Sequence, residues 1–248
     1  MSLGFAGRIS AVSMIAAGCL LAGGPAARAG YQTVDMSGVV NIPFSSEING
    51  STFPTGAQTF NGVPFSIANV SNGNGGYNNF WTGGGSSTVA PGTYSVTLSL
   101  SDVLDVTRVY TMINTLWGSA NTKNVLDITF NAGNGGASVT QDLIDGVNVR
   151  DYNLSYGNTI NGTTTKQAFS NGKGQVLDMQ EYTLPSYFAT DGLASVTLTE
   201  NGASGYEKAM FSALTLQTGA PVGVAEPLSL SLLLTGIAGL AAVRRRRC

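Results

Sequence analysis

The chain has 248 residues, with 14 acidic and 12 basic side chains, and it contains no histidine. The absence of histidine excludes catalytic triads built on histidine and zinc or copper sites with histidine ligands. Its two cysteines, Cys19 and Cys248, lie near the two ends of the chain, so the sequence between them offers no thiol nucleophile and no thiolate metal ligand.

The first 29 residues have the order of a secretory signal peptide. Arg8 precedes an apolar stretch, and an Ala-Arg-Ala sequence places the small residues Ala27 and Ala29 where signal peptidase requires them. The sequence therefore predicts a signal-peptide helix over residues 1–29, cleaved after Ala29. An alternative is a lipoprotein signal that carries its lipid on Cys19, but the apolar stretch continues past this cysteine, which favours the ordinary signal peptide.

The central sequence, Gly30 to Val224, is acidic and rich in neutral polar residues. It holds six basic and thirteen acidic side chains, a difference of −7. Because a surface of this charge repels phosphate backbones, nucleic acid is excluded as a partner. Gly, Asn, Ser and Thr are abundant in the same region, and their polar groups suit a hydroxyl-rich neighbour such as polysaccharide.

Nine segments of the central sequence have the composition of β-strands. In Thr93–Leu100, apolar residues alternate with Thr and Ser, as expected for a strand with one buried face. Gly/Asn-rich stretches at 72–76 and 131–136 are typical of tight turns. For Pro185–Asp191 we expect a single helical turn. The nine predicted strands are Met36–Phe44, Val63–Ala68, Thr93–Leu100, Val106–Ile113, Asn124–Asn131, Ala137–Ile144, Gln175–Leu184, Ala194–Thr199 and Ala209–Gln217.

Nine strands separated by turns, with no long helical period, predict an all-β fold. Two antiparallel sheets would form a β-sandwich over residues 30–218. Residues 219–223 read Gly-Ala-Pro-Val-Gly, a small-residue spacer that would hold the following tail clear of the domain. The predicted organisation is therefore a signal peptide, one sandwich domain, a spacer and a tail.

Four stretches of the predicted sandwich carry a resemblance to a known fold. Asn61–Phe65 opens the core, Val109–Gly118 and Gly146–Tyr152 follow, and Phe211–Leu216 closes it. This order is similar to that of galactose-binding-like jelly rolls, which include carbohydrate-binding modules. The resemblance implies an antiparallel jelly-roll-like β-sandwich. Such folds host sugar binding, adhesion and scaffolding, so the resemblance does not by itself choose among these functions.

A short aromatic and amide-rich segment is the best sequence candidate for ligand binding. Tyr77, Asn78, Asn79 and Trp81 lie between glycines that are typical of a loop. Aromatic rings stack on the apolar faces of sugars, and amides bond their hydroxyls, so this segment predicts a carbohydrate-binding loop. The alternative is structural, because Phe80 and Trp81 could begin a strand and fill the core.

Two further positions are assigned to structure rather than to binding. Trp117 follows a β-branched strand and precedes Gly118, and we interpret it as a plug packed inside the sandwich, with ligand contact as the alternative. Arg150 and Asp151 are adjacent between apolar neighbours. We interpret them as an internal ion pair or loop clasp rather than a ligand clamp.

Acidic residues are the candidates for catalysis. A hydrolase or lyase acting on polysaccharide would need two facing carboxylates, and Asp142, Asp145 and Asp151, or Asp178 and Glu181, could supply them. However, Asp145 before a glycine is typical of a turn, and Asp178 and Glu181 fall on the solvent side of one predicted strand. We therefore expect a non-catalytic protein, with such an enzyme as the alternative. The sequence indicates no cofactor and no defined metal site, although oxygen ligands in such sandwiches can hold a structural Ca²⁺.

The last 25 residues have the order of a membrane anchor. A Val-Ala-Glu-Pro sequence at 224–227 precedes an apolar run of 16 residues, 228–243, and a block of four cations. As a helix this run rises about 24 Å, and arginines that reach the headgroups let it span a hydrocarbon core of about 30 Å. The sequence therefore predicts a transmembrane helix stopped on the cytoplasmic side. The stop is formed by Arg244, Arg245, Arg246 and Arg247.

This tail resembles the PEP-CTERM sorting signal of Gram-negative bacteria, with Val224, Glu226 and Pro227 as the sorting motif and Ala225 where the family usually has proline. The resemblance implies recognition by an exosortase, after signal peptidase has acted at the other end. It also implies transient anchoring in the inner membrane, removal of the tail, and release to the cell surface or extracellular polysaccharide matrix. We therefore expect a secreted carbohydrate-binding or structural protein, with a protein-binding adhesin as a further alternative.

Overall fold

The structure, a computed structural model, describes residues 30–47, 53–85, 92–120, 122–157, 159–202 and 206–219. Within these ranges no helix is long and apolar enough to cross a membrane. The predicted signal peptide and the tail helix lie outside them. The elements are β1 Gly30–Thr33, α1 Phe44–Glu47, β2 Gly56–Phe60, β3 Val63–Ile67, β4 Val70–Ser71, β5 Tyr77–Asn78, η1 Gly83–Gly85, β6 Thr93–Val103, β7 Val106–Leu116, β8 Asn124–Ala132, β9 Ser138–Ile144, β10 Thr165–Ser170, β11 Val176–Thr183, α2 Tyr187–Asp191, β12 Leu193–Asn201 and β13 Lys208–Thr218.

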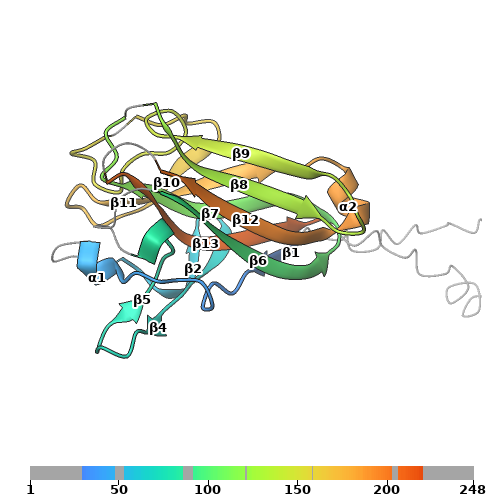
Figure 1. Cartoon of the computed structure of the whole chain (residues 1–248), viewed down its shortest axis with the longest axis horizontal. Helices are drawn as coiled ribbons and strands as arrows, with labels where there is room; N and C mark the ends of the chain where they lie inside the picture. The colour runs from blue at the N-terminus through green and yellow to red at the C-terminus, as the bar shows by residue number, and fades with distance from the viewer. Residues whose placement is uncertain are drawn as a thin grey trace, which may run out of the picture.

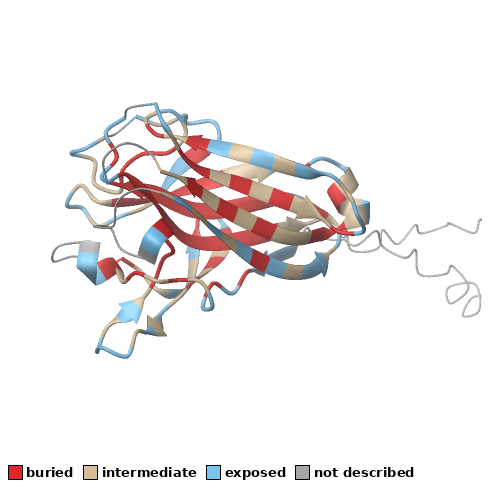
Figure 2. Cartoon of the chain, in the orientation of Figure 1, coloured by how far each residue is buried: buried red, intermediate tan, exposed pale blue. Residues whose placement is uncertain are grey.

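Two curled antiparallel sheets pack face to face (Figure 1). One has five strands in the order β1-β13-β7-β11-β10, and the other has four in the order β6-β12-β8-β9. Both sheets contribute to a shared apolar core that includes Ile113, Phe130, Val196, Phe211 and Leu214. Along the central strands of the four-stranded sheet, β12 and β8, buried residues alternate with partly exposed ones, because only one face is covered (Figure 2). The all-β prediction is confirmed, and the arrangement is consistent with a sandwich.

The outer face of the five-stranded sheet is covered as well. The hairpin β2–β3 and the segment around α1 supply a second apolar cluster, in which Phe44, Phe65 and Phe80 pack with Met112 of β7. Since Ile113 faces the inter-sheet core, successive residues of β7 are buried on opposite faces of the same sheet. This double coverage explains why β7 and β13 are buried along most of their length rather than at alternating positions.

The predicted strands agree with the structure at eight of nine segments, from Val63–Ala68 to Ala209–Gln217, and α2 lies inside the predicted helical turn. The exception is Met36–Phe44, for which the strand prediction is wrong. Its apolar side chains are buried, but its backbone forms a turn on the carbonyl of Met36 and a single bridge from Ile42 to Phe80. The side chains of this segment are therefore buried at intervals because they pack on the sandwich. Among the described residues, its backbone forms a single bridge and no ladder with a neighbouring strand.

The two ends of the sandwich differ in what they carry. At one end Gly30 pairs with Thr218, so the first and the last strands of the described structure meet there. At the opposite end Leu116 pairs with Lys208. After β7, β9 and β10, the loops 117–123, 145–157 and 171–175 gather at this second end, which we call the loop end (Figure 1).

Candidate functional site

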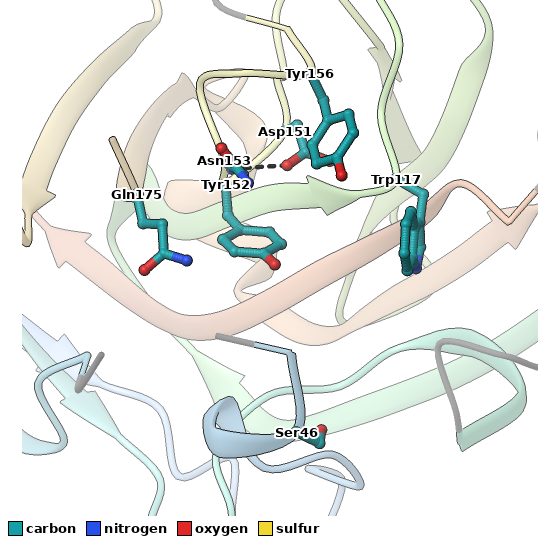
Figure 3. A pocket seen from close by; sticks show the side chains of 7 residues that line it. All are labelled: Ser46, Trp117, Asp151, Tyr152, Asn153, Tyr156 and Gln175. Atoms are coloured by element: carbon teal, nitrogen blue, oxygen red, sulfur yellow. Dashed lines mark hydrogen bonds between the residues drawn. The ribbon is translucent and has the colours of Figure 1, made fainter. Parts of the chain in front are cut away.

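A hollow of about 290 Å³ opens at the loop end. Trp117, directly after β7, provides one wall and loop 145–157 provides the other, while α1 and the last residue of loop 171–175 complete the lining (Figure 3). The lining combines aromatic rings, amides and one carboxylate, and its residues are Ser46, Trp117, Asp151, Tyr152, Asn153, Tyr156 and Gln175.

Two half-exposed aromatic rings form the rim of this hollow. Trp117 is 51% exposed and Tyr156 is 54% exposed, and their ring centroids lie 6.2 Å apart with the planes tilted by 53°. Trp117 has φ 58, a left-handed conformation that turns the chain at the end of β7. Because this conformation is unfavourable for a large side chain, surrounding contacts must hold it in place. The interpretation of Trp117 as an internal plug is therefore wrong.

Two side-chain amides, those of Asn153 and Gln175, line the hollow together with the rings. Asn153 and Gln175 form an isolated antiparallel bridge, which joins loop 145–157 to loop 171–175. The side-chain oxygen of Asn153 accepts a hydrogen bond from the Ser155 N–H, and that of Gln175 accepts one from the Asn171 amide. Within the described residues, neither side-chain amide nitrogen donates a hydrogen bond to the protein, so both can donate to a ligand hydroxyl.

Asp151 lies beneath the rim and contacts both walls. Its Oδ2 accepts the Gly118 N–H at 2.7 Å. Its Oδ1 accepts the Asn153 N–H at 2.7 Å, the hydrogen bond drawn in Figure 3. Burial raises the pKa of Asp151 to about 7; the two N–H donors oppose this shift and the nearby carboxylate of Asp145 adds to it. Asp145 is also buried, and its Oδ2 accepts the Ser119 N–H at 3.0 Å.

Arg150 pairs with Asp178 and not with Asp151, so the predicted ion pair is corrected. Its Nε and one terminal nitrogen bond the two carboxylate oxygens of Asp178 at 2.7 and 2.8 Å. Both side chains are almost fully buried, which also contradicts the prediction that Asp178 faces solvent. Asn114 of β7 donates a third hydrogen bond to Asp178 at 3.0 Å. This network fixes loop 145–157 to β7 and β11 directly behind the hollow.

The segment singled out from the sequence does not form one surface. Trp81 is only 5% exposed and belongs to the inter-sheet core, where its backbone pairs with Phe211. Asn79 is buried, and its side chain bonds the Phe44 N–H and the Ala68 carbonyl. Tyr77 is exposed and Asn78 is half-buried. Two of the four candidate residues are therefore structural in their contacts, and Tyr77 and Asn78 are the accessible pair.

The carboxylates considered for catalysis lie in different environments. Asp142 is exposed on β9, whereas Asp145 and Asp151 are buried and hold the backbone of loop 117–123. Glu181 is half-buried and pairs with Arg108 at 3.3 Å. In the ranges that the structure covers, no three Asp, Glu, Cys or His side chains lie close enough together to hold a metal ion.

Sequence reasoning missed most of the hollow, namely Ser46, Tyr152, Asn153, Tyr156 and Gln175. One signal could have found part of it. Tyr152 and Tyr156 lie in an Asn/Ser/Gly-rich stretch without strand alternation, where a core role for both rings is unexpected.

No family model matches this chain, and comparison with curated proteins and with solved structures found no match. The chemistry of the hollow therefore has to be inferred from its own residues.

Proposed function

We propose that this protein is an exported, non-catalytic carbohydrate-binding protein of the cell surface or extracellular polysaccharide matrix, with a galactose-binding-like, jelly-roll-like fold. The observation that carries the proposal is the pair of half-exposed rings, Trp117 and Tyr156, on the rim of a hollow lined by amides. A large exposed tryptophan in a strained backbone conformation is unfavourable for a purely structural role, which supports a binding role.

The chemistry of the hollow suits a neutral sugar. Sugar rings have apolar C–H faces that can lie on aromatic side chains, and their hydroxyls can bond the amides of Asn153 and Gln175. A hollow of about 290 Å³ is near the lower end of small-ligand sites, so one or two sugar residues of a longer chain would fill it. The remaining polymer would extend over the exposed rim.

The position of the hollow agrees with the predicted export route. The strands that connect to the signal peptide and to the tail meet at one end of the sandwich, and the hollow lies at the opposite end. A protein still held in the membrane by its tail would therefore present the hollow away from the anchor. Binding would remain available before and after removal of the tail by an exosortase.

A glycan array probed with protein recovered after export tests the proposal. Replacing Trp117 by alanine should weaken binding to the retained glycans about five- to thirtyfold, because a stacking contact on the order of 1–2 kcal/mol is lost. Tyr77→Ala is the matched control, since Tyr77 is equally exposed but lies in the segment favoured by sequence alone. Binding that depends on Tyr77 and not on Trp117 would place the site elsewhere.

Processing of the tail has its own test. The double substitution Glu226→Ala with Pro227→Ala should leave the protein unprocessed and retained in the inner membrane, because the motif proposed to be read by the exosortase is gone. Fractionation and intact-mass measurement check this outcome. Replacement of Val224 alone provides a milder comparison. If the doubly substituted protein is still trimmed and released, the sorting assignment is wrong.

A polysaccharide-acting hydrolase is a second candidate, favoured by one observation. A carboxyl group with a pKa of about 7 in a hollow is typical of a general acid. However, both oxygens of Asp151 already accept backbone N–H groups, which ties this side chain to the loops. Release of reducing ends from a glycan that binds on the array, abolished by Asp151→Asn, would favour the enzyme.

A further inference from the structure

We infer that Asp151 is a positioning residue of the proposed binding site: its single carboxylate holds together the two loops that carry Trp117 and Tyr156, and its charge state controls how firmly the rim is closed. This inference rests on the proposed function for its biological meaning, but its structural core concerns only the protein's own contacts. Each oxygen of the carboxylate bonds a different wall of the hollow.

The first wall is held close to the carboxylate. Asp151 Oδ2 accepts the N–H of Gly118, the residue directly after Trp117. A Cβ atom at Gly118 would lie 2.2 Å from Thr115 Oγ1, 3.1 Å from Asp145 Oδ1 and 3.3 Å from Asp151 Cβ. The absence of a side chain therefore lets this backbone approach, and the hydrogen bond then supports the left-handed conformation of Trp117.

The second wall depends on the other oxygen. Asp151 Oδ1 accepts the N–H of Asn153 at 2.7 Å. The Asn153 carbonyl accepts the N–H of Tyr156 at 3.0 Å, and its side-chain oxygen accepts the N–H of Ser155 at 3.1 Å. The turn that presents the Tyr156 ring is thus built on a residue fixed by Asp151. One carboxylate thereby sets the separation of the two rings.

Other charged and titratable groups surround this carboxylate on each packed element. Asp145, at the end of β9, adds negative charge, and its N–H bonds the carbonyl of Lys123 on loop 117–123. Arg150 precedes Asp151 in the chain, but its guanidinium bonds Asp178 of β11. The phenols of Tyr152 and Tyr156 line the same hollow.

Ionisation would weaken this arrangement. In the closed rim, burial raises the pKa of Asp151 to about 7, whereas a rim that opens brings water to the carboxylate and returns its pKa toward the ordinary value. The closed rim therefore binds the proton more tightly than the open rim, so protonation favours closure even though the ionised carboxylate is the better acceptor of the two N–H groups. The change falls between about pH 6 and 8: below this range the rim is held closed, and above it the rim loosens.

Fluorescence of Trp117 tests the inference without any ligand. The chain has two tryptophans, and Trp81 is buried, so Trp81→Phe leaves Trp117 as the reporter. Acrylamide quenching should rise about twofold as the pH rises through about 7, because a looser rim exposes the indole more often. If Trp81→Phe does not fold, the difference between wild type and Trp117→Phe supplies the same signal.

Two further variants test whether Asp151 is the group that causes the pH transition. Asp151→Asn should abolish the pH transition, and Asp142→Asn, an exposed carboxylate on β9, should leave it unchanged. A transition that persists in Asp151→Asn, or that is absent in wild type, overturns the inference. Affinity for a glycan retained on the array should also fall about tenfold from pH 5.5 to pH 8, and not in Asp151→Asn. If no glycan binds at any pH, the proposed function fails while the fluorescence result still decides the role of Asp151.

Discussion

Replacing Arg150 by alanine is expected to lower the free energy of unfolding by about 3–5 kcal/mol. Asp178 would remain almost fully buried, with the Asn114 amide but without the guanidinium that now bonds both of its oxygens. An uncompensated buried charge is among the largest single penalties that a folded protein can receive. Because the same pair fixes loop 145–157, the hollow should lose its shape together with the stability.

Urea unfolding of wild type and Arg150→Ala measures this effect, and the chain offers a matched control. Arg108 pairs with Glu181 at 3.3 Å, but the two side chains are 47% and 30% exposed. Solvent screens such a pair, so Arg108→Ala should change stability by about 0–1 kcal/mol. Equal losses for the two arginine variants would show that the buried pair contributes no more than a surface one.

The strands that could be predicted are those in which the order of apolar and polar residues follows the burial of the side chains. β6 alternates because one face meets the core, and β7 carries apolar residues at successive positions, such as Met112 and Ile113, because both of its faces are covered. β1, β2 and β10 were missed, since their side chains are mostly exposed and only backbone pairing makes them strands. Whether a strand lies at the edge of a sheet depends on which other strands pair with it. The sequence of the strand alone does not show this.

The candidate site was harder to predict because contacts distant in sequence decide the role of each residue. Both tryptophans follow apolar or aromatic residues and precede small ones, yet their roles are opposite. Trp81 is buried because Phe211, far along the chain, pairs with its backbone. Trp117 is exposed because its φ of 58 turns it out of β7. Similarly, Arg150 selects Asp178 over its neighbour Asp151, a choice that adjacency in the sequence could not reveal.

Asp151 should make the protein less stable as the pH rises from about 4 to about 7. Burial raises its pKa to about 7, whereas the unfolded chain titrates near the ordinary value of 3.8. Between these values the folded state retains a proton that the unfolded state has lost, so the free energy of unfolding falls by up to about 1.4 kcal/mol per pH unit. The loss should reach the order of 4 kcal/mol by pH 8.

The difference in unfolding free energy between wild type and Asp151→Asn, measured in urea at pH 4.5, 6 and 7.5, isolates this contribution from the other titrating groups. Glu200, whose pKa is also raised by burial, cancels in that difference. A difference that does not change with pH would contradict the assignment. The direction is the same as that expected for the rim, because the folded chain and the closed rim both bury Asp151 and therefore both favour its protonated form. A buried carboxylate that lowers stability near neutral pH, and that nevertheless bonds both loops, is expected where a binding site rather than the stability of the fold determines the residue.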